Sequence, residues 1–316
     1  MSSLNRLLVG KTELTRVYLP LLLALALGIA AIVVYVRTQE VPIDPISVPS
    51  PSPSTLSTTT PSGTPKITPT ITPNFTQSPI STSTPSPLPT TIPTPFVTKA
   101  GNWAGYIVSN DLQKPQSNVT RISGSWTVPA VAASTNNSYS AVWIGIGGQF
   151  DQTLIQCGTE QDFVGGRPVY SAWYELLPNR AIMIQSMTVS PGDEIEASIR
   201  AVNNTGDEWF ISITDVTTGR SFQRNFVYTS TQLSAEWIIE RPNVNGFLSQ
   251  LADFGDVTFT NCLASIGGTS GGISNFPALK TVMYSTLGSD PNSVQLTEVS
   301  SLNTNGTIFT VSCLVV

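Results

Sequence analysis

One carboxylic acid of this chain lies in an unusual setting that suits proton-transfer chemistry. Glu236 occurs beside Trp237 in the segment 234–240, SAEWIIE, which has the composition of a β-strand. Alternate residues of a strand share a face, so Glu236 and Glu240 point to one side of the predicted sheet and Trp237 to the other. Aromatic walls disfavour the charged form of a carboxyl, so we expect the pKa of Glu236 to rise toward the range that is useful for proton transfer.

A glutamine in an earlier predicted strand could complete such a site. Gln156 lies in the segment 153–157, TLIQC. Its uncharged NH₂ group could stabilise a developing oxyanion without itself titrating. If Gln156 and Glu236 lie on neighbouring strands of one sheet face, the amide and the acid could converge. The alternative interpretation is that Glu236 faces solvent from a surface strand and that Gln156 is a hydrogen-bonded buried amide.

The absence of histidine excludes several other chemistries. Without it, Ser–His and Cys–His nucleophile pairs and His-based zinc sites cannot form. The segment 268–272, GTSGG, matches the G-x-S-x-G pattern of some hydrolases, but no strand–turn–helix context surrounds it. We therefore interpret this segment as a flexible loop. No metal and no cofactor are expected in the site.

The region that carries these residues has the pattern of an all-β domain. Helical periodicity is nearly absent, and short alternating runs are separated by Gly, Asn, Asp and Pro. Strands are predicted at 121–128, 139–146, 153–157, 169–176, 182–189, 194–201, 209–214, 221–227, 235–240, 257–262, 281–285, 294–299 and 307–316. The segment 216–219, VTTG, is the expected hairpin turn between two of them. Because no crossover helices separate the strands, the pattern predicts an antiparallel β-sandwich or jelly roll.

The N-terminal part of the chain has the composition of a membrane anchor. Residues 17–36 form an uncharged run of 20 residues, which is long enough for a transmembrane helix. Three basic residues within 1–16 precede this run, and only Arg37 follows it before Lys66. This asymmetry predicts a cytoplasmic segment 1–16 and an outer C-terminus. We therefore expect a single-pass signal anchor that holds the domain outside the cell membrane; a cleaved signal peptide and a secreted domain are the alternative.

A linker and one acidic domain are predicted after the anchor. Residues 37–98 contain 15 of the 24 prolines and are dominated by Pro, Ser and Thr, so they predict a disordered, extended stalk. Residues 99–316 are enough for one domain with a sizeable core. This domain has ten Lys and Arg against 17 Asp and Glu, a net charge of −7. Such a domain is not expected to bind nucleic acid.

The cysteine count leaves two interpretations open. Cys157, Cys262 and Cys313 are an odd number, so at least one is unpaired. Cys262 and Cys313 both lie in predicted C-terminal strands and could form a disulfide. The alternative is that all three are small buried apolar residues. None of them has the spacing of a metal site.

Several short blocks of the domain occur in a characteristic order. They are NWAGY at 102–106, WIGI at 143–146, LIQCG at 154–158, YSAWYE at 170–175, AEWI at 235–238, ADFG at 252–255 and VTFTN at 257–261. Together they cover roughly residues 100–265 and resemble the glutamic peptidases, also called eqolisins, peptidase family G1 or formerly A4.

This resemblance implies a fold, an activity and a site. The family's fold is a sandwich of two bent antiparallel sheets, a jelly roll of the concanavalin A-like lectin type, which agrees with the predicted strands. Its catalytic pair is a Gln and a Glu, matched here by Gln156 and Glu236. Its substrate-groove positions fall on Trp103, Trp143 and Glu175. We therefore expect a monomeric, membrane-tethered endopeptidase that hydrolyses peptides or unfolded proteins at acidic pH without a cofactor.

The chain departs from the family pattern beside the expected site. Gly147 and Ser171 stand where the family carries Asp, and Leu176 and Leu177 replace an aromatic pair. These changes leave the Gln–Glu pair intact. They are expected to reshape the groove and to remove acidic neighbours that would tune the pKa of Glu236.

Two functions of other classes remain open from the sequence. A stalked sandwich with a Trp-lined sheet could be a catalytically inactive, lectin-like module that binds carbohydrate or protein. The domain could also be a glycosidase with Glu236 and Glu175 as its carboxylate pair, which requires the two carboxyls to face each other about 5–10 Å apart.

Overall fold

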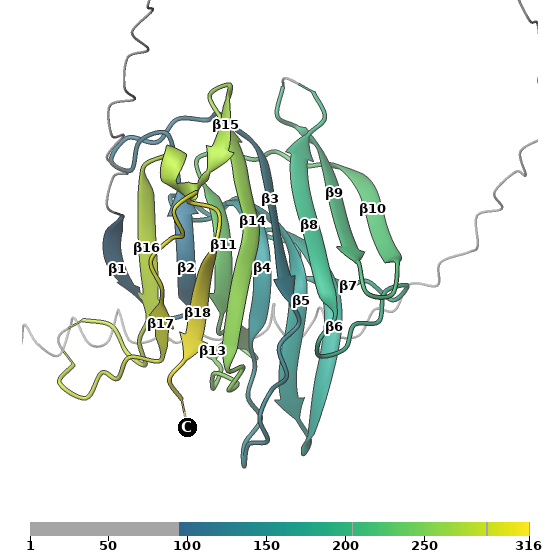
Figure 1. Ribbon diagram of the computed structural model, residues 1–316, viewed down its shortest axis with the longest axis vertical. Helices are drawn as coiled ribbons and strands as arrows, with labels where there is room; N and C mark the ends of the chain where they lie inside the picture. Colours follow the sequence, from purple (N-terminus) through teal and green to yellow (C-terminus); the bar gives the residue numbers. More distant parts are fainter. Residues whose placement is uncertain (1–94, 204, 289, 316) are drawn as a thin grey trace, which may run out of the picture. The chain divides into compact units, whose positions relative to one another are not determined.

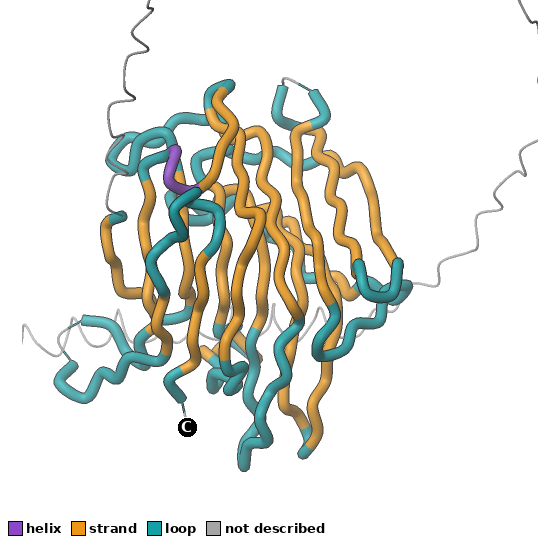
Figure 2. Tube along the Cα trace, viewed as in Figure 1, coloured by secondary structure: helices purple, strands orange, loops and turns teal. Residues whose placement is uncertain are grey.

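The computed structural model describes residues 95–203, 205–288 and 290–315. The predicted cytoplasmic segment 1–16, the predicted membrane segment 17–36 and nearly all of the predicted linker 37–98 lie outside these residues. Within the described residues, no helix is long and apolar enough to cross a membrane. The described part consists of strands and loops with one short helix (Figure 2).

The first sheet carries the predicted Gln–Glu pair and has eight strands. Their bounds are β1 (Phe96–Ala100), β2 (Trp103–Val108), β4 (Ala141–Gly147), β5 (Leu154–Val164), β6 (Arg167–Leu176), β7 (Ile182–Met183), β11 (Ala235–Glu240) and β16 (Ala278–Met283). The strand order is β1-β16-β2-β11-β4-β5-β6-β7 (Figure 1). All pairs are antiparallel except β1 with β16, which is parallel. Strand β11 therefore lies directly beside β4, far from it in the chain.

The second sheet packs against one face of the first. Its strands are β3 (Val119–Thr127), β8 (Glu194–Ala201), β9 (Glu208–Asp215), β10 (Arg220–Val227), β14 (Asp256–Ile266), β17 (Thr297–Val299) and β18 (Phe309–Cys313). They follow the order β10-β9-β8-β3-β14-β18-β17, and β15 (Thr269–Gly272) pairs with β14. A two-stranded ribbon, β12 (Asn243–Val244) with β13 (Phe247–Leu248), and the 3₁₀ helix η1 (Ile273–Asn275) complete the domain.

The main core lies between the two sheets and follows from strand alternation. In β9 the residues Trp209, Ile211 and Ile213 are fully buried, and their neighbours in the strand are only partly buried. Phe259 of β14 stacks on Phe309 of β18 with ring centroids 4.9 Å apart. Each large apolar side chain that is fully buried stabilises the fold by about 1.5–3 kcal/mol. This alternation turns the other residues of each strand to the outer faces of the sandwich.

The predicted sandwich is confirmed, and several of its elements have the predicted bounds. Strands β8 and β11 begin and end where the alternation predicts. The segment 216–219 is the hairpin turn between β9 and β10, where the amide of Gly219 donates to the carbonyl of Asp215 at 2.8 Å. Strand β1 begins at Phe96, before the predicted domain start at residue 99.

Two local predictions need correction. The interpretation of 268–272 as a flexible loop is wrong, because Thr269–Gly272 form β15, and Ser265 Oγ and Ser270 Oγ lie 2.7 Å apart across this hairpin. Of the strand predicted at 182–189, only Ile182–Met183 is regular, and the rest follows the edge of the sheet as loop. The glycine-rich composition of 268–272 suggested a loop, and the apolar composition of 182–189 suggested a strand. In both segments the conformation depends on whether a neighbouring strand is available for pairing.

The cysteines of the described domain form no disulfide. Cys157 and Cys262 are buried and Cys313 is half-buried, all three as free thiols. The possible Cys262–Cys313 bridge is not present: Cys262 donates its amide to Thr307 O, whereas Cys313 pairs with Thr297. The second interpretation of the three cysteines, as small core residues, therefore holds for Cys157 and Cys262.

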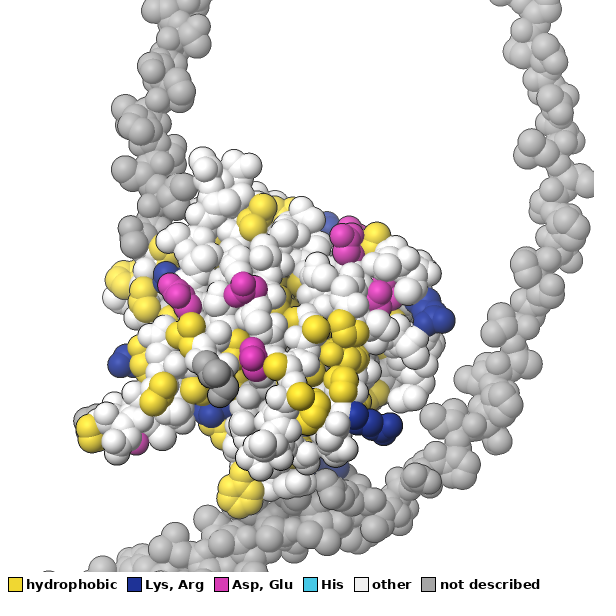
Figure 3. Space-filling model, turned by 60° about the horizontal axis from the view of Figure 1, so that its bottom comes forward, with side chains coloured by type: hydrophobic (Ala, Val, Ile, Leu, Met, Phe, Trp, Pro, Cys, Tyr) yellow, Lys and Arg dark blue, Asp and Glu magenta, His cyan; other side chains and the backbone are white. Residues whose placement is uncertain are grey.

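The surface of the domain carries few charges. On the face shown in Figure 3, Asp and Glu side chains lie singly among neutral polar atoms and hydrophobic patches, and Lys and Arg lie mostly near the margins. Among the described residues there is no group of three His, Cys, Asp or Glu that could hold a metal ion.

Candidate active site

The two predicted catalytic residues flank one glycine in the middle of the first sheet. Gly145 of β4 pairs with Gln156 of β5 on one side and with Glu236 of β11 on the other. Residues paired in this way point to the same face, so the amide and the acid project side by side. With strand spacings of about 4.8 Å, their Cα atoms are roughly 10 Å apart.

Glycine at position 145 leaves a break in the row of side chains between the amide and the acid, which we call the glycine gap. Neighbouring side chains close over it, because a Cβ atom there would lie 2.8 Å from Leu154 Cδ1 and 2.9 Å from Trp143 Cζ3, closer than packed atoms tolerate. Leu154 and Trp143 therefore pack against the backbone between Gln156 and Glu236. The amide and the carboxyl can both hydrogen-bond to a small molecule such as water.

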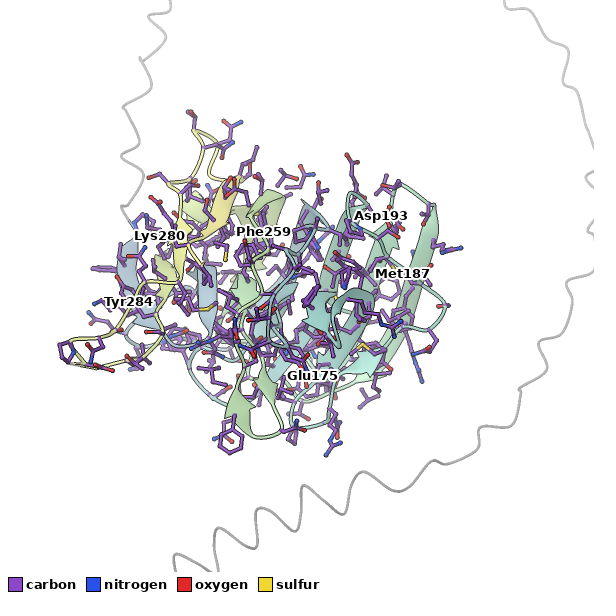
Figure 4. The ribbon with its side chains drawn as sticks, turned by 90° about the horizontal axis from the view of Figure 1, so that it is seen from below. Glu175, Met187, Asp193, Phe259, Lys280 and Tyr284 are labelled. Atoms are coloured by element: carbon purple, nitrogen blue, oxygen red, sulfur yellow. The ribbon has the colours of Figure 1, made fainter. Side chains whose placement is uncertain are left out.

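This site lies on the face of the first sheet that points away from the second sheet. A separate apolar cluster, which we call the outer-face cluster, covers this face and consists of Ile107, Ala141, Trp143, Leu154, Trp173 and Ile238, with Trp103, Leu177 and Leu279 at its margin. Leu154 belongs to it, whereas Ile155 and Cys157 belong to the core between the sheets. In Figure 4, Glu175 of the first sheet lies on the side opposite Phe259 of the second sheet.

Glu236 is fully buried, and neither of its carboxyl oxygens has a hydrogen-bond partner among the described residues. Burial raises the pKa of Glu236 well above its usual value; the Ser234 hydroxyl acts in the opposite direction, and the charge of Asp151 raises the pKa further. An unpartnered buried carboxyl is costly, which makes Glu236 a candidate functional group. The elevated pKa predicted for Glu236 from its Trp-rich setting has the expected direction.

Gln156 is held by a second carboxyl. Its Nε2 donates to Glu175 Oε2 at 2.6 Å, and its Oε1 has no partner among the described residues. Glu175 follows Gln156 in the same row of the sheet, because the two residues pair across β5 and β6. Burial raises the pKa of Glu175, and the hydrogen bond from Gln156 partly offsets this rise. The bond fixes the amide group so that its second N–H hydrogen remains available.

Two tryptophans predicted to contact substrate lie together beside the glycine gap. The rings of Trp103 and Trp143 meet edge to face, with centroids 5.1 Å apart. Trp143 Nε1 donates to Glu240 Oε2 at 2.9 Å, and Asn102 Nδ2 donates to Glu240 Oε1 at 3.3 Å. The structure therefore brings all five predicted site residues, Trp103, Trp143, Gln156, Glu175 and Glu236, to one face of one sheet.

Three further acids lie on this face without a predicted role, namely Glu160, Asp162 and Glu240. Burial raises the pKa of Glu240 to about 7, although hydrogen bonds from its neighbours lower it. Burial, with the charge of Glu160, raises the pKa of Asp162 to about 7, and burial also raises the pKa of Glu160. Residues 156, 160 and 162 of β5 share one face by alternation. This shared face is the feature of the sequence from which Glu160 and Asp162 could have been placed beside Gln156.

An acid outside the two departing positions acts on Glu236. Gly147 and Ser171 carry no carboxyl, and the charge of Asp151 raises the pKa of Glu236. The loop 148–153 places it there: Thr153 donates its amide and hydroxyl to Asp151 Oδ1 at 2.9 and 3.0 Å. Gly148 of the same loop packs against the Trp103 ring. A different part of the chain therefore supplies the negative charge.

The glycosidase arrangement is not favoured by this geometry. Glu236 and Glu175 lie in one row but are three strands apart, with Gly145 and Gln156 between them. Three strand spacings place their Cα atoms roughly 14 Å apart. Gln156 occupies the place that a facing carboxylate pair needs, and its amide holds Glu175 instead.

The chain is similar to known peptidases over most of the described domain. A model of the Peptidase A4 family matches residues 101–309. Aspergillopepsin-2 of Aspergillus niger is 30% identical over 200 residues, which cover 56% of this chain and 68% of that protein. Scytalidopepsin B of Scytalidium lignicola is 29% identical over 184 residues, which cover 55% of this chain and 66% of that protein. This chain thus spans about two-thirds of each relative's length.

Solved structures share the fold. A crystal structure of scytalido-glutamic peptidase with a transition state analog inhibitor aligns with a TM-score of 0.56 and 23% identity, over 68% of this chain and 98% of that one. A second structure of that peptidase, with a peptide-based transition state analog, aligns with a TM-score of 0.54 and 25% identity over the same shares. Both similarities support the sandwich of two antiparallel sheets.

Proposed function

Since this chain belongs to the peptidase A4 family of glutamic endopeptidases, we propose that Glu236 and Gln156 hydrolyse peptide bonds by activating a water molecule between them. The observation that carries this proposal is the row Glu236–Gly145–Gln156, in which two functional side chains point to one face across a residue without a side chain. Glu236 and Gln156 each have oxygen atoms without a hydrogen-bond partner among the described residues. These oxygen atoms can therefore accept hydrogen bonds from a water molecule or a substrate.

The proposed reaction uses only these two side chains and water. Glu236 takes a proton from water as the water oxygen attacks the carbonyl carbon of the substrate. The free N–H hydrogen of Gln156 stabilises the oxyanion of the tetrahedral intermediate. Glu236 then returns the proton to the amide nitrogen as the C–N bond breaks. General acid–base catalysis of this kind contributes about 10²–10⁴-fold, and one oxyanion donor about 10²–10³-fold.

Acidic pH should favour this reaction because the leaving amine must be protonated as the C–N bond breaks. Glu236 must be ionised when it accepts the proton from water, and hydrogen bonds from water and Gln156 favour its ionised form. Burial and the charge of Asp151 act against that ionisation. The pH profile of kcat/KM measures the balance of these effects, because it reports the pKa of the essential base in the free enzyme.

The remaining site residues have binding and positioning roles in this proposal. Trp103 is partly exposed and packs on the buried Trp143, so its ring offers the aromatic surface on which an extended peptide or a segment of an unfolded protein would lie. Glu175 orients the Gln156 amide in addition to its expected contact with substrate. The reaction needs no metal and no second copy of the chain.

The proposal is tested by cleavage of a denatured protein at pH 3–5. Glu236→Gln and Gln156→Ala should each abolish cleavage, and pepstatin-type inhibitors should not affect the wild type. Matched control variants are Glu196→Gln and Gln223→Ala, whose side chains are exposed on the second sheet and should leave activity intact. Substantial activity in either site variant would reject the assignment, and glycan binding without proteolysis would support the lectin-like alternative.

We also propose that residues 17–36 anchor the chain in a membrane and that residues 37–98 hold the domain outside the cell. Support comes from the uncharged run of 20 residues and from the basic residues that precede it. The full chain should fractionate with membranes and be accessible to added protease from outside. Recovery of the domain in the soluble secreted fraction, with its N-terminus after residue 36, would instead indicate a cleaved signal peptide.

A further inference from the structure

A second groove adjoins the proposed active site at the edge of the first sheet. It has a volume of about 340 Å³ and is lined by Thr98, Lys99, Ala100, Asn102, Trp103, Gly148, Gln149 and Thr281. Three of these residues belong to β1, which is the edge strand of the sheet and lies beside β16 (Figure 1). The groove therefore exists in this form only because β1 is part of the sheet.

Strand β1 lies outside the region that matches the family model, which begins at residue 101, after the last residue of β1. In the parallel pair with β16, Thr98 is opposite Thr281, and Thr281 is opposite Gly105 of β2. Gly105 is in turn paired with Ile238, a member of the outer-face cluster. Thr98 thus extends the face that carries Gln156 and Glu236.

Trp103 connects this groove with the proposed catalytic pair. Its ring lines the groove, and it also contacts Trp143, which borders the gap at Gly145. Thr281 is two strands from Glu236 and two residues along the strand direction from its row. These sheet spacings correspond to roughly 12 Å, which an extended peptide covers in about four residues.

We propose that the groove between β1, Trp103 and the loop at Gly148 is a substrate subsite, which binds a neutral hydrogen-bonding side chain about four residues from the cleaved bond. This inference rests on the proposed peptidase function and deepens it. The bound side chain is that of Gln, Asn, Ser or Thr.

The lining of the groove determines this choice of side chain. Thr98, Asn102, Gln149 and Thr281 provide hydroxyl and amide groups, and the indole of Trp103 provides one flat apolar wall. Thr98 makes no side-chain hydrogen bond within the described residues that would compete with a ligand, and it is exposed. Lys99 is opposite Val282, a residue of the core between the sheets, so its side chain leaves β1 on the face opposite to that of Thr98. There its Nζ lies 4.4 Å from the centre of the Tyr284 ring.

The test uses the full chain and fluorogenic peptides of two lengths. One peptide has a short cleavable centre, and the others are extended by five residues at either end, with Gln or Ala at each added position in turn. At one added position, about four residues from the cleaved bond, KM should be about three- to tenfold lower with Gln than with Ala, as expected for one or two hydrogen bonds.

Variants of the groove separate the subsite from the chemistry. Thr98→Val should remove most of the preference for Gln, with kcat as in the wild type. Thr214→Val, in a polar groove of the second sheet, is the matched control and should keep this preference. Melting temperatures of the variants show whether each is folded.

The outcomes distinguish the two proposals. If the wild type cleaves the peptides but no added position changes KM, or if Thr98→Val and Thr214→Val behave alike, the subsite is wrong and the peptidase function stands. If the wild type cleaves none of the peptides while the control variants and the wild type are all folded, the peptidase function is wrong and the subsite is wrong with it.

Discussion

The two outer faces of the sandwich are built by the same alternation of strand residues but differ in chemistry. On the first sheet, five carboxyls lie on or beside the outer-face cluster, those of Glu160, Asp162, Glu175, Glu236 and Glu240, and burial raises the pKa of each. On the second sheet, a groove of about 290 Å³ is lined mainly by hydroxyl and amide side chains, and Glu196 beside it is exposed.

This difference shows what converts a surface acid into a reactive one. A carboxyl at a strand position is ordinary where its neighbours are Ser and Thr, because water reaches it. It becomes a candidate acid–base group where Trp and Leu side chains surround it, as on the outer face of the first sheet. The apolar setting supplies the pKa shift, and Gly145 lets Leu154 and Trp143 pack between the acid and the amide.

The largest expected effect comes from adding a side chain at Gly145. Gly145→Val should reduce kcat by at least about 10²-fold, since its side chain displaces Leu154 and Trp143 between Gln156 and Glu236. The overpacking should also lower the free energy of unfolding by about 1–3 kcal/mol. Ser198→Thr adds a methyl group to the outer face of the second sheet and should change neither quantity. Activity and thermal unfolding measured on both variants check this; an active Gly145→Val enzyme would show that the gap is not the reaction site.

A smaller effect is expected at Glu175. Glu175→Ala removes the acceptor of the Gln156 amide and should lower kcat about tenfold, with KM changed less. Glu175→Gln retains an acceptor oxygen and should restore much of the rate. Glu196→Ala, on the second sheet, is the control. If Glu175→Ala raised only KM, Glu175 would be a substrate-binding residue and would not orient Gln156.

The smallest expected effect is on the pH dependence of stability. Glu240 and Asp162 have pKa values of about 7 in the fold and ordinary values near 4 when unfolded. The folded state therefore binds protons more tightly, so their contribution to stability is present below about pH 4 and is lost as pH rises toward 7. The melting temperature of the wild type should decrease over this pH range. It should decrease less steeply in Glu240→Gln, and as steeply as in the wild type in Glu196→Gln. A melting temperature that rises from pH 4 to 7 equally in all three proteins would contradict the pKa shifts.

Much of the fold followed from local patterns in the sequence, whereas the site depended on pairing. Alternation in segments such as 194–201 and 235–240 fixed both strand and face. The resemblance singled out Gln156 and Glu236, but their common partner Gly145 could not be predicted, because β4, β5 and β11 come together only through long-range register. The role of Glu240 depends on the same register, since its partner Trp143 lies two strand positions from the gap.

Composition concealed the other features. Strand β1 follows directly on the Pro-rich segment and has no alternating pattern of its own. Its first three residues therefore fall in the linker predicted up to residue 98. The contact of Asp151 with the site depends on how the loop 148–153 folds back over the sheet, which no periodicity encodes. Both features lie in segments where backbone geometry, rather than residue type, decides the outcome.

The most direct test of the central claim is a double-mutant comparison of kcat/KM at acidic pH. Glu236→Gln, Gln156→Ala and the double variant are measured on one peptide. Two groups that act on one water and one carbonyl fail together, so the double variant should be no more than about threefold slower than Glu236→Gln alone. A double variant that loses the product of the two separate factors would show that the amide and the acid act independently, and would contradict a shared site across Gly145.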